Sequence, residues 1–441
     1  MNQMSPLRIA IVTRAMASLH GPGGLERHVD DLVRHLLASG TAVTLITRPS
    51  TRGVDSQQSE ILNHQHLTFH PISYRTFPGF GYRGTTILDR NSAYPFFGWR
   101  AGRVAARLAQ DGQIDLVHGH GASVLGFART RQLDAYRVPF VLNPHGMEEF
   151  GGRGHTRSAL KALANRPLQL AVRACAHAAD CIIATDKAMV PNVVSNLRTQ
   201  ESRVTVVPNA VDLEVCDRYA SIELGRQQRT TNGITPSEFL ILSVGRLDKN
   251  KGFDVLARAL AQVNQSQSGQ TPVSGLEQNW RWVVVGEGPE HQALVKLVNQ
   301  LGIGGRTVFT GRLSDADVHA WYETASLFIH PTLYEGSSLA TLEAMAHRRP
   351  VIATMVGGLP DKVEPGVSGW LVEPGSVTAL AAVIRDAIGQ TERLATMGQA
   401  GRSIVERDFS WNTVIKHLLA VYRELLLRAE ALSHVQGRVS G

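Results

Sequence analysis

The sequence has few cysteines and no long hydrophobic run, and each shortage excludes a class of protein. Its three cysteines, Cys175, Cys181 and Cys216, are odd in number and do not have metal-ligand spacing. We therefore expect reduced, buried thiols and neither a disulfide framework nor a zinc site. No apolar run reaches the roughly 18–20 residues of a membrane span. The run at 7–13 is too short for a signal-peptide core, so a cytosolic chain is expected.

Length and charge narrow the class of protein further. A chain of 441 residues is too long for one core and fits two domains of about 200 residues each. Hydrophobic residues at 43% and charged residues at 19% indicate an ordinary globular protein. The net charge of +7 fits an anionic nucleotide, a membrane surface or nucleic acid equally well, so charge alone does not decide the partner.

Short β-rich runs alternate with longer helical patterns along the chain. Such alternation predicts parallel sheets covered on both faces. A polar stretch without hydrophobic periodicity, 226–238, separates two sets of runs. We therefore predict an α/β protein of two doubly wound Rossmann-like domains with a cleft between them, and ligands at the carboxyl ends of the strands. The predicted strands are 7–13, 42–47, 115–120, 140–146, 181–186 and 204–210, then 239–245, 280–288, 307–311, 327–332 and 350–354.

A glycine-rich loop precedes the first clear amphipathic helix. Gly21, Gly23 and Gly24 come before a helix whose predicted buried face is Val29, Leu32, Val33, Leu36 and Leu37. Free amides at a helix start suit an anion, although a simple strand-helix turn would look the same. This loop is not a GxGxxG fingerprint, because Glu26 stands where the third glycine would be, and 286–291 does not match that pattern either. The chain contains no GxxxxGK[ST] pattern, so a dehydrogenase and a P-loop enzyme both lose support.

Charged residues follow two predicted strands of the second half. Arg246 and Lys251 come after 239–245, where a planar guanidinium and a point charge can hold a diphosphate; alone, they would be solvated surface charges. Glu335 follows 327–332, and Glu343 lies on the next helix. Two carboxylates there favour sugar binding or acid-base chemistry. The alternative is that Glu335 caps the helix and Glu343 faces solvent.

With these features in order, the chain resembles glycosyltransferase family 4, the retaining GT-B-fold enzymes that use nucleotide-sugar donors. Only the linker and the extreme ends lie outside the resemblance. The matching motifs are GGLERHV (23–29), HGHG (118–121), NPHG (143–146), VVPNAVD (206–212), VGRLDKNKG (244–252), VVVGEGP (283–289), the pair Glu335 and Glu343, VGGLPD (356–361) and SGWLVEPG (368–375).

The resemblance implies a role for each matched residue. Arg246 and Lys251 correspond to the pair that holds the donor diphosphate and stabilises its charge as the sugar leaves. Glu343 corresponds to the carboxylate that binds the ribose, and Glu335 to the one near the donor sugar. The implied catalytic residues are His145, Glu335, Arg246 and Lys251. The implied donor-binding residues are Gly23, Gly24, Arg246, Lys251, Glu335, Gly336, Ser337, Ser338, Leu339, Ala340 and Glu343.

The resemblance also implies an organisation into domains. Residues 1–215 would form an acceptor-binding Rossmann-like domain, 216–237 a linker, and 238–405 the nucleotide-sugar-binding domain. Residues 406–441 would form a closing helix that returns to the first domain.

The implied reaction moves a sugar from a UDP- or GDP-sugar to a hydroxyl of a glycan or lipid-linked acceptor, in cell-envelope or polysaccharide synthesis. Neither a cofactor nor a metal would be required, because Arg246 and Lys251 take the part of Mg²⁺. A sugar-nucleotide epimerase or a phosphorylase on the same fold is the alternative. Nucleic acid is not expected as a partner, because the chain lacks a basic helix and an aromatic stacking platform.

Two motifs that resemble metal sites have simpler explanations. Asp315 and Asp317 form a DxD, but Ser314 or Asp315 can cap a helix with Asp317 in its first turn. His118 and His120 lie on a predicted strand, and we expect them to point to opposite faces, which disfavours a shared metal.

Two arginine-rich segments, 96–108 and 152–174, contain few acidic residues. A basic amphipathic segment can lie on an anionic bilayer, so peripheral contact with the inner face of the cytoplasmic membrane is predicted. The alternative is a solvated helix face that its leucines pack on the domain core. The second segment contains Arg153, Arg157, Lys161, Arg166 and Arg173 among Leu160, Leu163, Leu168 and Leu170.

Overall fold

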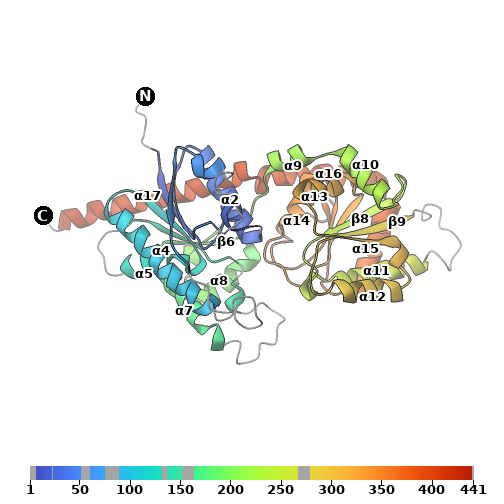
Figure 1. Cartoon of the computed structure of the whole chain (residues 1–441), viewed down its shortest axis with the longest axis horizontal. Helices are drawn as coiled ribbons and strands as arrows, with labels where there is room; N and C mark the ends of the chain where they lie inside the picture. The colour runs from blue at the N-terminus through green and yellow to red at the C-terminus, as the bar shows by residue number, and fades with distance from the viewer. Residues whose placement is uncertain are drawn as a thin grey trace. The chain divides into compact units, whose positions relative to one another are not determined.

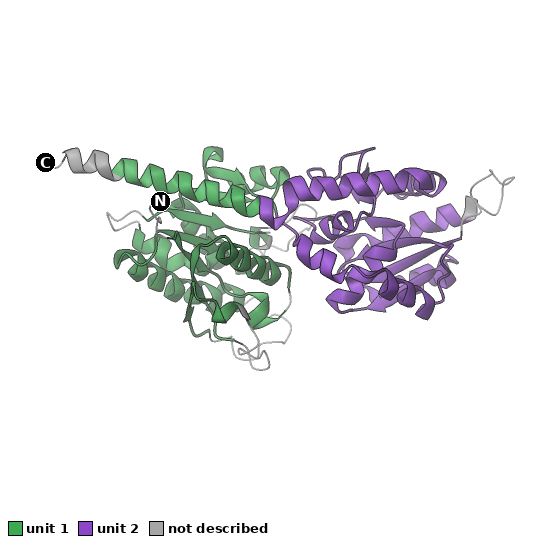
Figure 2. Ribbon diagram, turned by 90° about the horizontal axis from the view of Figure 1, so that it is seen from above, with its two compact units in different colours: residues 1–208, 414–441 green, residues 209–413 purple. Residues whose placement is uncertain are grey.

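The chain groups into two compact units in a computed structural model (Figure 2). Unit 1 comprises 1–208 and 414–441, and unit 2 comprises 209–413. The boundary at 208 precedes the predicted one at 215, and the cleft expected between the domains stays a prediction. The structure describes residues 6–21, 23–50, 60–74, 89–131, 138–145, 147–150, 163–266 and 279–439.

Unit 1 contains a seven-stranded parallel sheet in the order β3-β2-β1-β4-β5-β6-β7. β1 lies between β2 and β4, with Ile9 opposite Val43 of β2 on one side and Leu116 of β4 on the other. Strand β3 is partly exposed to solvent and was not predicted, because it lacks the apolar run of a central strand. The strands are β1 (Arg8–Val12), β2 (Ala42–Thr47), β3 (Leu67–Pro71), β4 (Leu116–His120), β5 (Phe140–Asn143), β6 (Cys181–Ala184) and β7 (Val204–Val206).

Helices cover this sheet, and α4, α5 and α7 pack against one another (Figure 1). The predicted apolar face of α2 is confirmed, because all five of its residues are buried. The helices are α1 (Ala17–His20), α2 (Gly24–Ala38), α4 (Ala93–Gln110), α5 (Leu125–Arg131), α7 (Arg166–Ala178) and α8 (Val190–Leu197). Short 3-10 turns are η1 (Glu60–Asn63), η2 (Gly121–Val124), η3 (Glu148–Phe150), η4 (Lys187–Met189) and η5 (Glu201–Arg203).

Unit 2 repeats the strand order of unit 1 in a six-stranded parallel sheet, β10-β9-β8-β11-β12-β13. Trp282 and Val283 of β9 point to opposite faces and are both fully buried, so this sheet is covered on both faces. β13 was quoted as a motif but not predicted as a strand. The strands are β8 (Phe239–Val244), β9 (Trp280–Val285), β10 (Thr307–Gly311), β11 (Leu327–His330), β12 (Val351–Thr354) and β13 (Gly369–Val372).

The helices of unit 2 pack on both faces of its sheet, and the last helix, α17, begins at Trp411 after a π-helical turn. From Val414 onward α17 belongs to unit 1. The elements are α9 (Leu213–Tyr219), α10 (Ile222–Thr231), η6 (Lys249–Lys251), α11 (Phe253–Ser266), α12 (His291–Gln300), η7 (Gly304–Arg306), α13 (Asp315–Thr324), α14 (Leu339–Ala346), α15 (Val377–Gly389), α16 (Thr391–Ile404), η8 (Val405–Phe409) and α17 (Trp411–Val439).

The segment 216–237, predicted as a linker, is mostly helical and packs within unit 2. Asp212 caps α9 and Ser221 caps α10 through their side chains. Buried Arg229 of α10 donates to the carbonyl oxygens of Thr324 and Thr235. The prediction was wrong because polar contacts and caps hold α10 here, whereas hydrophobic periodicity detects only helices with an apolar stripe.

The DxD at Asp315 and Asp317 begins a helix, as predicted. Ser314 is the N-cap of α13, and its hydroxyl accepts from the Asp317 amide at 3.2 Å. The same hydroxyl donates to the Asp317 carboxylate at 2.6 Å. The other carboxylate oxygen of Asp317 accepts from Gln228 of α10 at 2.8 Å. Asp317 is therefore engaged in a capping arrangement.

Two further observations concern disulfides and membrane-spanning helices. Cys175, Cys181 and Cys216 are buried and free, so no disulfide joins them. Within the described ranges, no helix combines the length and the apolar character needed to cross a membrane.

The backbones of α16 and of the residues after α14 lie so close together that we expect the stability of the protein to depend on a glycine at position 398. A Cβ on Gly398 would lie 1.9 Å from the carbonyl oxygen of Arg348, whereas a Cβ on Gly389 would meet nothing within 4 Å. We expect Gly398→Ala to lower the free energy of unfolding by about 1–3 kcal/mol through this overpacking. Gly389→Ala, the control, should change it by less than about 1 kcal/mol. Urea unfolding measures both, and equal effects would contradict the close packing.

Candidate active site

The strand order reverses between two neighbouring strands in each sheet. In unit 2 these are β8 and β11, which pair in parallel with Leu327 opposite Ile241. Their carboxyl ends meet at one edge, and ligands of doubly wound sheets bind at this switch point. The predicted donor residues lie in the two loops that leave these strands.

Lys251 and Glu335 come together at this edge although 84 residues separate them. The Lys251 ammonium lies 2.5 Å from Oε2 of Glu335, and the side chains are only 19% and 14% exposed. His330, the last residue of β11, places its Nε2 2.8 Å from the same oxygen and is 2% exposed. Sequence analysis missed His330, although its place at a strand end was a signal. The three side chains form a shielded charged cluster, here called the switch-point cluster.

The switch-point cluster keeps Glu335 ionised. Burial alone would raise the pKa of Glu335, but the hydrogen bond from His330 and the charge of Lys251 lower this pKa to about 2. Burial lowers the pKa of His330, and Glu335 only partly opposes that effect. A neutral imidazole therefore donates to a carboxylate, which can accept further hydrogen bonds.

Backbone contacts bring the two loops together. The carbonyl oxygen of Asn250 accepts from the Leu333 amide at 2.7 Å and from the Thr332 hydroxyl at 2.9 Å. Gly252, which ends η6, has φ of 65°, and a Cβ there would lie 2.2 Å from the Pro331 carbonyl oxygen. Only glycine fits this close approach without strain. The turn around Gly252 therefore sets the position of Lys251.

Arg246 lies at the same sheet edge, but it is not part of the switch-point cluster. Its side chain is 71% exposed, and its Nε lies 2.9 Å from the Asp248 carboxylate. Because Arg246 follows β8 by two residues, rotation of this exposed side chain can carry its charge over the strand ends. The structure thus places the two predicted cations in one loop without joining them.

The start of α14 carries most of the predicted donor-binding residues. Gly336 and Ser337 precede the helix, Ser338 caps it by accepting from the Thr341 amide at 3.2 Å, and α14 begins with Leu339 and Ala340. The alternative that Glu335 is the cap is therefore wrong. The first amides of α14 point along the helix axis toward its start, where they favour an anion.

A buried lysine beneath this helix start was missed. Lys362 is 1% exposed, and its ammonium donates to the Ser337 hydroxyl at 3.0 Å and to the Gly358 carbonyl oxygen at 3.1 Å. The motif quoted from the sequence, 356–361, ends one residue earlier. A buried cation next to a helix N-terminus increases the attraction of this region for an anion.

Glu343 lies on α14 and is held from the side of α13. The Tyr322 hydroxyl is 3.1 Å from Oε2 of Glu343 and 3.1 Å from the Ala340 carbonyl oxygen. Glu343 is partly buried, which argues against the alternative that it simply faces solvent.

In unit 1 the predicted residues lie at the corresponding sheet edge. Gly23 is the N-cap of α2 and Gly24 its first residue. His145 follows β5 in the left-handed region, with φ of 56°, and its Nε2 lies 2.7 Å from Nδ1 of His120. The His145 ring thus contacts a second histidine, His120, at the end of β4.

The expectation that His118 and His120 point to opposite faces was wrong. Residues two apart on a strand share a face, and the two rings stack with centroids 4.7 Å apart. Burial, followed by the charges of neighbouring histidines, keeps the pKa of His120 and of His145 well below the usual value. Nδ1 of His118 lies 2.6 Å from the Tyr422 hydroxyl of α17. The row of rings is neutral and ends at α17.

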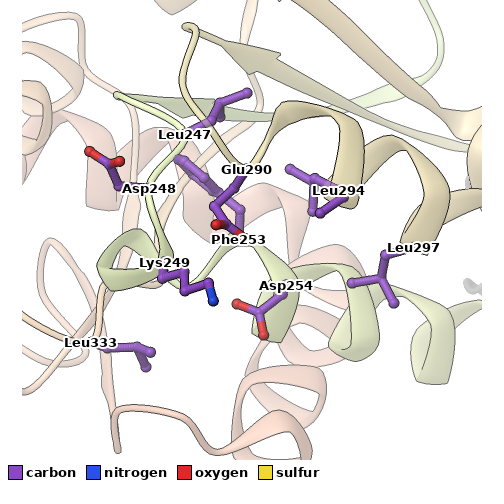
Figure 3. Close-up of a pocket in the computed structure, with 10 residues that line it drawn as sticks. Leu247, Asp248, Lys249, Phe253, Asp254, Glu290, Leu294, Leu297 and Leu333 are labelled. Carbon is purple, nitrogen blue, oxygen red and sulfur yellow. The ribbon is translucent and has the colours of Figure 1, made fainter. Parts of the chain in front are cut away.

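A cavity of about 420 Å³ lies beside η6 (Figure 3). Asp248, Asp254 and Glu290 give it an acidic rim, and its walls are mainly leucine and phenylalanine. Lys249 also lines the cavity, whereas Lys251, Glu335 and Glu343 do not. An excess of carboxylates disfavours a diphosphate, so this cavity is not the predicted donor position.

Comparisons with known proteins point to one family. Residues 22–215 match the family described as "Glycosyltransferase Family 4", and residues 226–404 match "Glycosyl transferases group 1". D-inositol 3-phosphate glycosyltransferase 1 of Catenulispora acidiphila is 32% identical over 343 residues, which cover 73% of this chain and 75% of that protein.

Solved structures show the same fold at lower identity. Sucrose-phosphate synthase from Thermosynechococcus elongatus has a TM-score of 0.72 and 22% identity, covering 96% of this chain and 100% of that one. Anabaena HepE in complex with UDP-glucose has a TM-score of 0.66 and 20% identity, covering 95% and 100%. The two Rossmann-like domains therefore form a GT-B fold.

The low pKa of Glu335 predicts a stability difference that depends on pH. Because its pKa is lower in the folded state, ionised Glu335 stabilises the fold above about pH 4.5, and this contribution is lost as pH falls toward about 2. Glu335→Gln should destabilise the protein by up to about 3 kcal/mol at neutral pH and by progressively less in acid. Urea midpoints of variant and wild type measure the difference.

The control for this comparison is Glu373→Gln, which changes an exposed glutamate of the same unit. Its difference from the wild type should stay small at every pH. A Glu335→Gln difference that does not shrink between about pH 4.5 and 3 would contradict the ion pair.

Proposed function

The chain belongs to glycosyltransferase family 4, and on that premise we propose that it transfers a sugar from a nucleoside-diphosphate donor to a hydroxyl with retention of anomeric configuration. The observation that carries this proposal is the contact of Lys251 with Glu335 at the switch point of unit 2. It gathers a cation for a diphosphate and a carboxylate for a sugar at the edge where doubly wound sheets bind ligands.

The donor diphosphate lies over the start of α14. Lys251 and a rotated Arg246 bind it from the β8 loop, and the first amides of α14 bind it from the β11 loop. Buried Lys362 adds positive charge below Ser337. These groups stabilise the leaving nucleoside diphosphate more than the intact donor, because negative charge grows as the sugar bond breaks. We propose that no metal takes part in this step.

The carboxylates orient the rest of the donor. Glu335 accepts hydrogen bonds from hydroxyls of the transferred sugar, and Glu343 accepts them from the ribose. For unit 1 we propose that neutral His145, supported by His120, binds the transferred sugar, and that the loop of Gly23 and Gly24 serves the diphosphate and the acceptor. Anabaena HepE was solved with UDP-glucose. Its likeness in fold supports a UDP-sugar here, and a GDP-sugar has the same diphosphate chemistry.

A sugar-nucleotide epimerase or a phosphorylase on this fold would use the same cations. Their products differ: an epimerase changes the sugar nucleotide without an acceptor, and a phosphorylase consumes inorganic phosphate. Transfer alone releases nucleoside diphosphate in step with a new glycoside.

The direct test incubates the protein with UDP- and GDP-sugars, with and without glycan or lipid-linked acceptors, in the presence of EDTA. We expect nucleoside diphosphate only with acceptor and a product whose anomeric proton by NMR matches that of the donor. Lys251→Ala should lower kcat/KM by about ten- to hundredfold or more, since a charge-assisted hydrogen bond contributes about 1.5–3 kcal/mol.

Lys249→Ala is the matched control, because Lys249 lies in the same turn but lines the acidic cavity. Its kcat/KM should stay near that of the wild type. Inverted product, turnover without acceptor, or activity that needs Mg²⁺ or Mn²⁺ after EDTA would each contradict the proposed reaction.

We further propose that the acceptor is reached at an anionic membrane surface. On α4, Phe96 is 61% exposed and stacks on Trp99, which is 42% exposed. Arg103 lies over the Trp99 ring, and Arg100 and Arg107 share the exposed side of α4. Exposed aromatics with interspersed arginines favour a bilayer interface.

Two exposed leucines lie nearby: Leu170 on α7, which contacts α4, and Leu163 just before α7 begins. Leu163 is 62% and Leu170 55% exposed, whereas Leu168 packs into the core. Among the leucines that the structure describes in this segment, the alternative of packing on the core therefore holds for Leu168 only. Arg153, Arg157, Leu160 and Lys161 lie outside the described residues.

Vesicle co-sedimentation tests the membrane contact. We expect binding to phosphatidylserine vesicles that weakens as salt is added, because each surface cation contributes about 1 kcal/mol. Arg103→Glu with Arg107→Glu should reduce binding at least about tenfold. The control pair Arg258→Glu with Arg393→Glu, exposed arginines of unit 2, should not. Protein that stays in the supernatant at low salt would favour a soluble acceptor instead.

A further inference from the structure

Three buried side chains of unit 2 converge at a place that the proposed transfer reaction does not use. Cys216 comes from α9, His319 from α13, and His347 is the residue that follows α14. Their ligand atoms all lie within 4.8 Å of one another, and all three residues are buried. Local sequence patterns do not predict this group, because about a hundred residues separate Cys216 from the nearer histidine, His319.

From this geometry we propose that Cys216, His319 and His347 bind one zinc ion, which links α9, α13 and the end of α14. A thiolate with two imidazoles is a donor set typical of Zn²⁺ and a poor one for Mg²⁺ or Ca²⁺. This inference revises the expectation that the chain holds no metal, and it does not depend on the proposed reaction.

The surroundings of His347 fit a metal ligand. Its Nδ1 lies 2.6 Å from Oε1 of Glu323, and its Nε2 lies 2.7 Å from Nδ1 of His319. A carboxylate that accepts from one ring nitrogen commonly fixes the other toward a metal. Arg349 lies 3.7 Å from the second oxygen of Glu323 and donates to the carbonyl oxygen of His347. The carboxylate is thus itself held in place.

Aromatic contacts fix both imidazole rings. The Tyr219 ring stacks on His319 with centroids 5.7 Å apart, and the Tyr322 ring stacks on His347 at 5.5 Å with an interplanar angle of 8°. Tyr322 also contacts Glu343 through its hydroxyl. The zinc ion would therefore hold in place the tyrosine against which Glu343 rests.

Zinc binding and the hydrogen bond between the histidines are alternative states of this cluster. Zn²⁺ would take the place between the ring nitrogens, and the proton that Nδ1 of His319 donates to His347 would move to Nε2 of the His319 ring. The thiol proton of Cys216 would leave to solvent as H⁺, and the sulfur would bind as thiolate. If the cluster forms only the hydrogen bond between the histidines, it binds no metal. Measuring the metal content therefore distinguishes the two states.

The test measures metal in the full-length protein, purified without a histidine tag. Mass spectrometry of the acid-digested protein should find about one zinc per chain. Co²⁺ added to protein freed of zinc should give the ultraviolet charge-transfer band of a cobalt-thiolate bond. Both signals should be lost in Cys216→Ala and in His319→Gln, and zinc should raise the Tm of the wild type but not of these variants.

Two controls separate this site from the other sulfur and imidazole groups. Cys175→Ala removes a buried cysteine of unit 1, and His120→Gln changes the histidine row beside His145. Both should keep the zinc and the cobalt band. Full-length protein that contains no zinc and binds no stoichiometric Zn²⁺ or Co²⁺ would overturn the proposal, as would zinc that Cys216→Ala retains.

Discussion

The contact between Lys251 and Glu335 is the interaction on which the candidate site depends. Each residue alone, at the end of its own strand, would be an ordinary surface charge with little consequence. The close approach of η6 to the β11 loop, possible because Gly252 has no Cβ, makes them neighbours. His330 and Lys251 keep Glu335 ionised against the effect of its burial, so the carboxylate can accept hydrogen bonds.

Helix α14 connects this cluster to the rest of unit 2. Its start carries the capping Ser338 above the buried Lys362, and Glu343 lies in its middle. Its end meets Gly398 of α16, and His347 follows it in the proposed zinc site. The start of this short helix thus lies in the region that attracts an anion, and its end packs against α16, which fixes the direction of the helix.

Much of this architecture could be predicted. Apolar runs that alternate with helical patterns indicate parallel strands, and charged residues directly after such strands indicate a ligand-binding site. Most central strands, the face of α2 and the Ser314 cap followed from such local patterns. His330, Lys362 and the cluster of Cys216 with two histidines did not, because their meaning comes from neighbours far away in the chain. Helix α10 was missed since Arg229 replaces the apolar stripe that periodicity detects, and the faces of His118 and His120 were misjudged.

The central claim is that the two glutamates divide the donor between them. Calorimetric titration of UDP and GDP into the wild type, Glu343→Gln and Glu335→Gln tests it without an acceptor or a sugar. We expect one nucleotide to bind the wild type, with Glu343→Gln weakening its binding by about tenfold or more because a hydrogen bond from the ribose to a charged group is lost. Glu335→Gln should leave this affinity nearly unchanged, because its partner, the sugar, is absent. Equal weakening by both variants, or a wild type that binds neither nucleotide, would contradict the assignment.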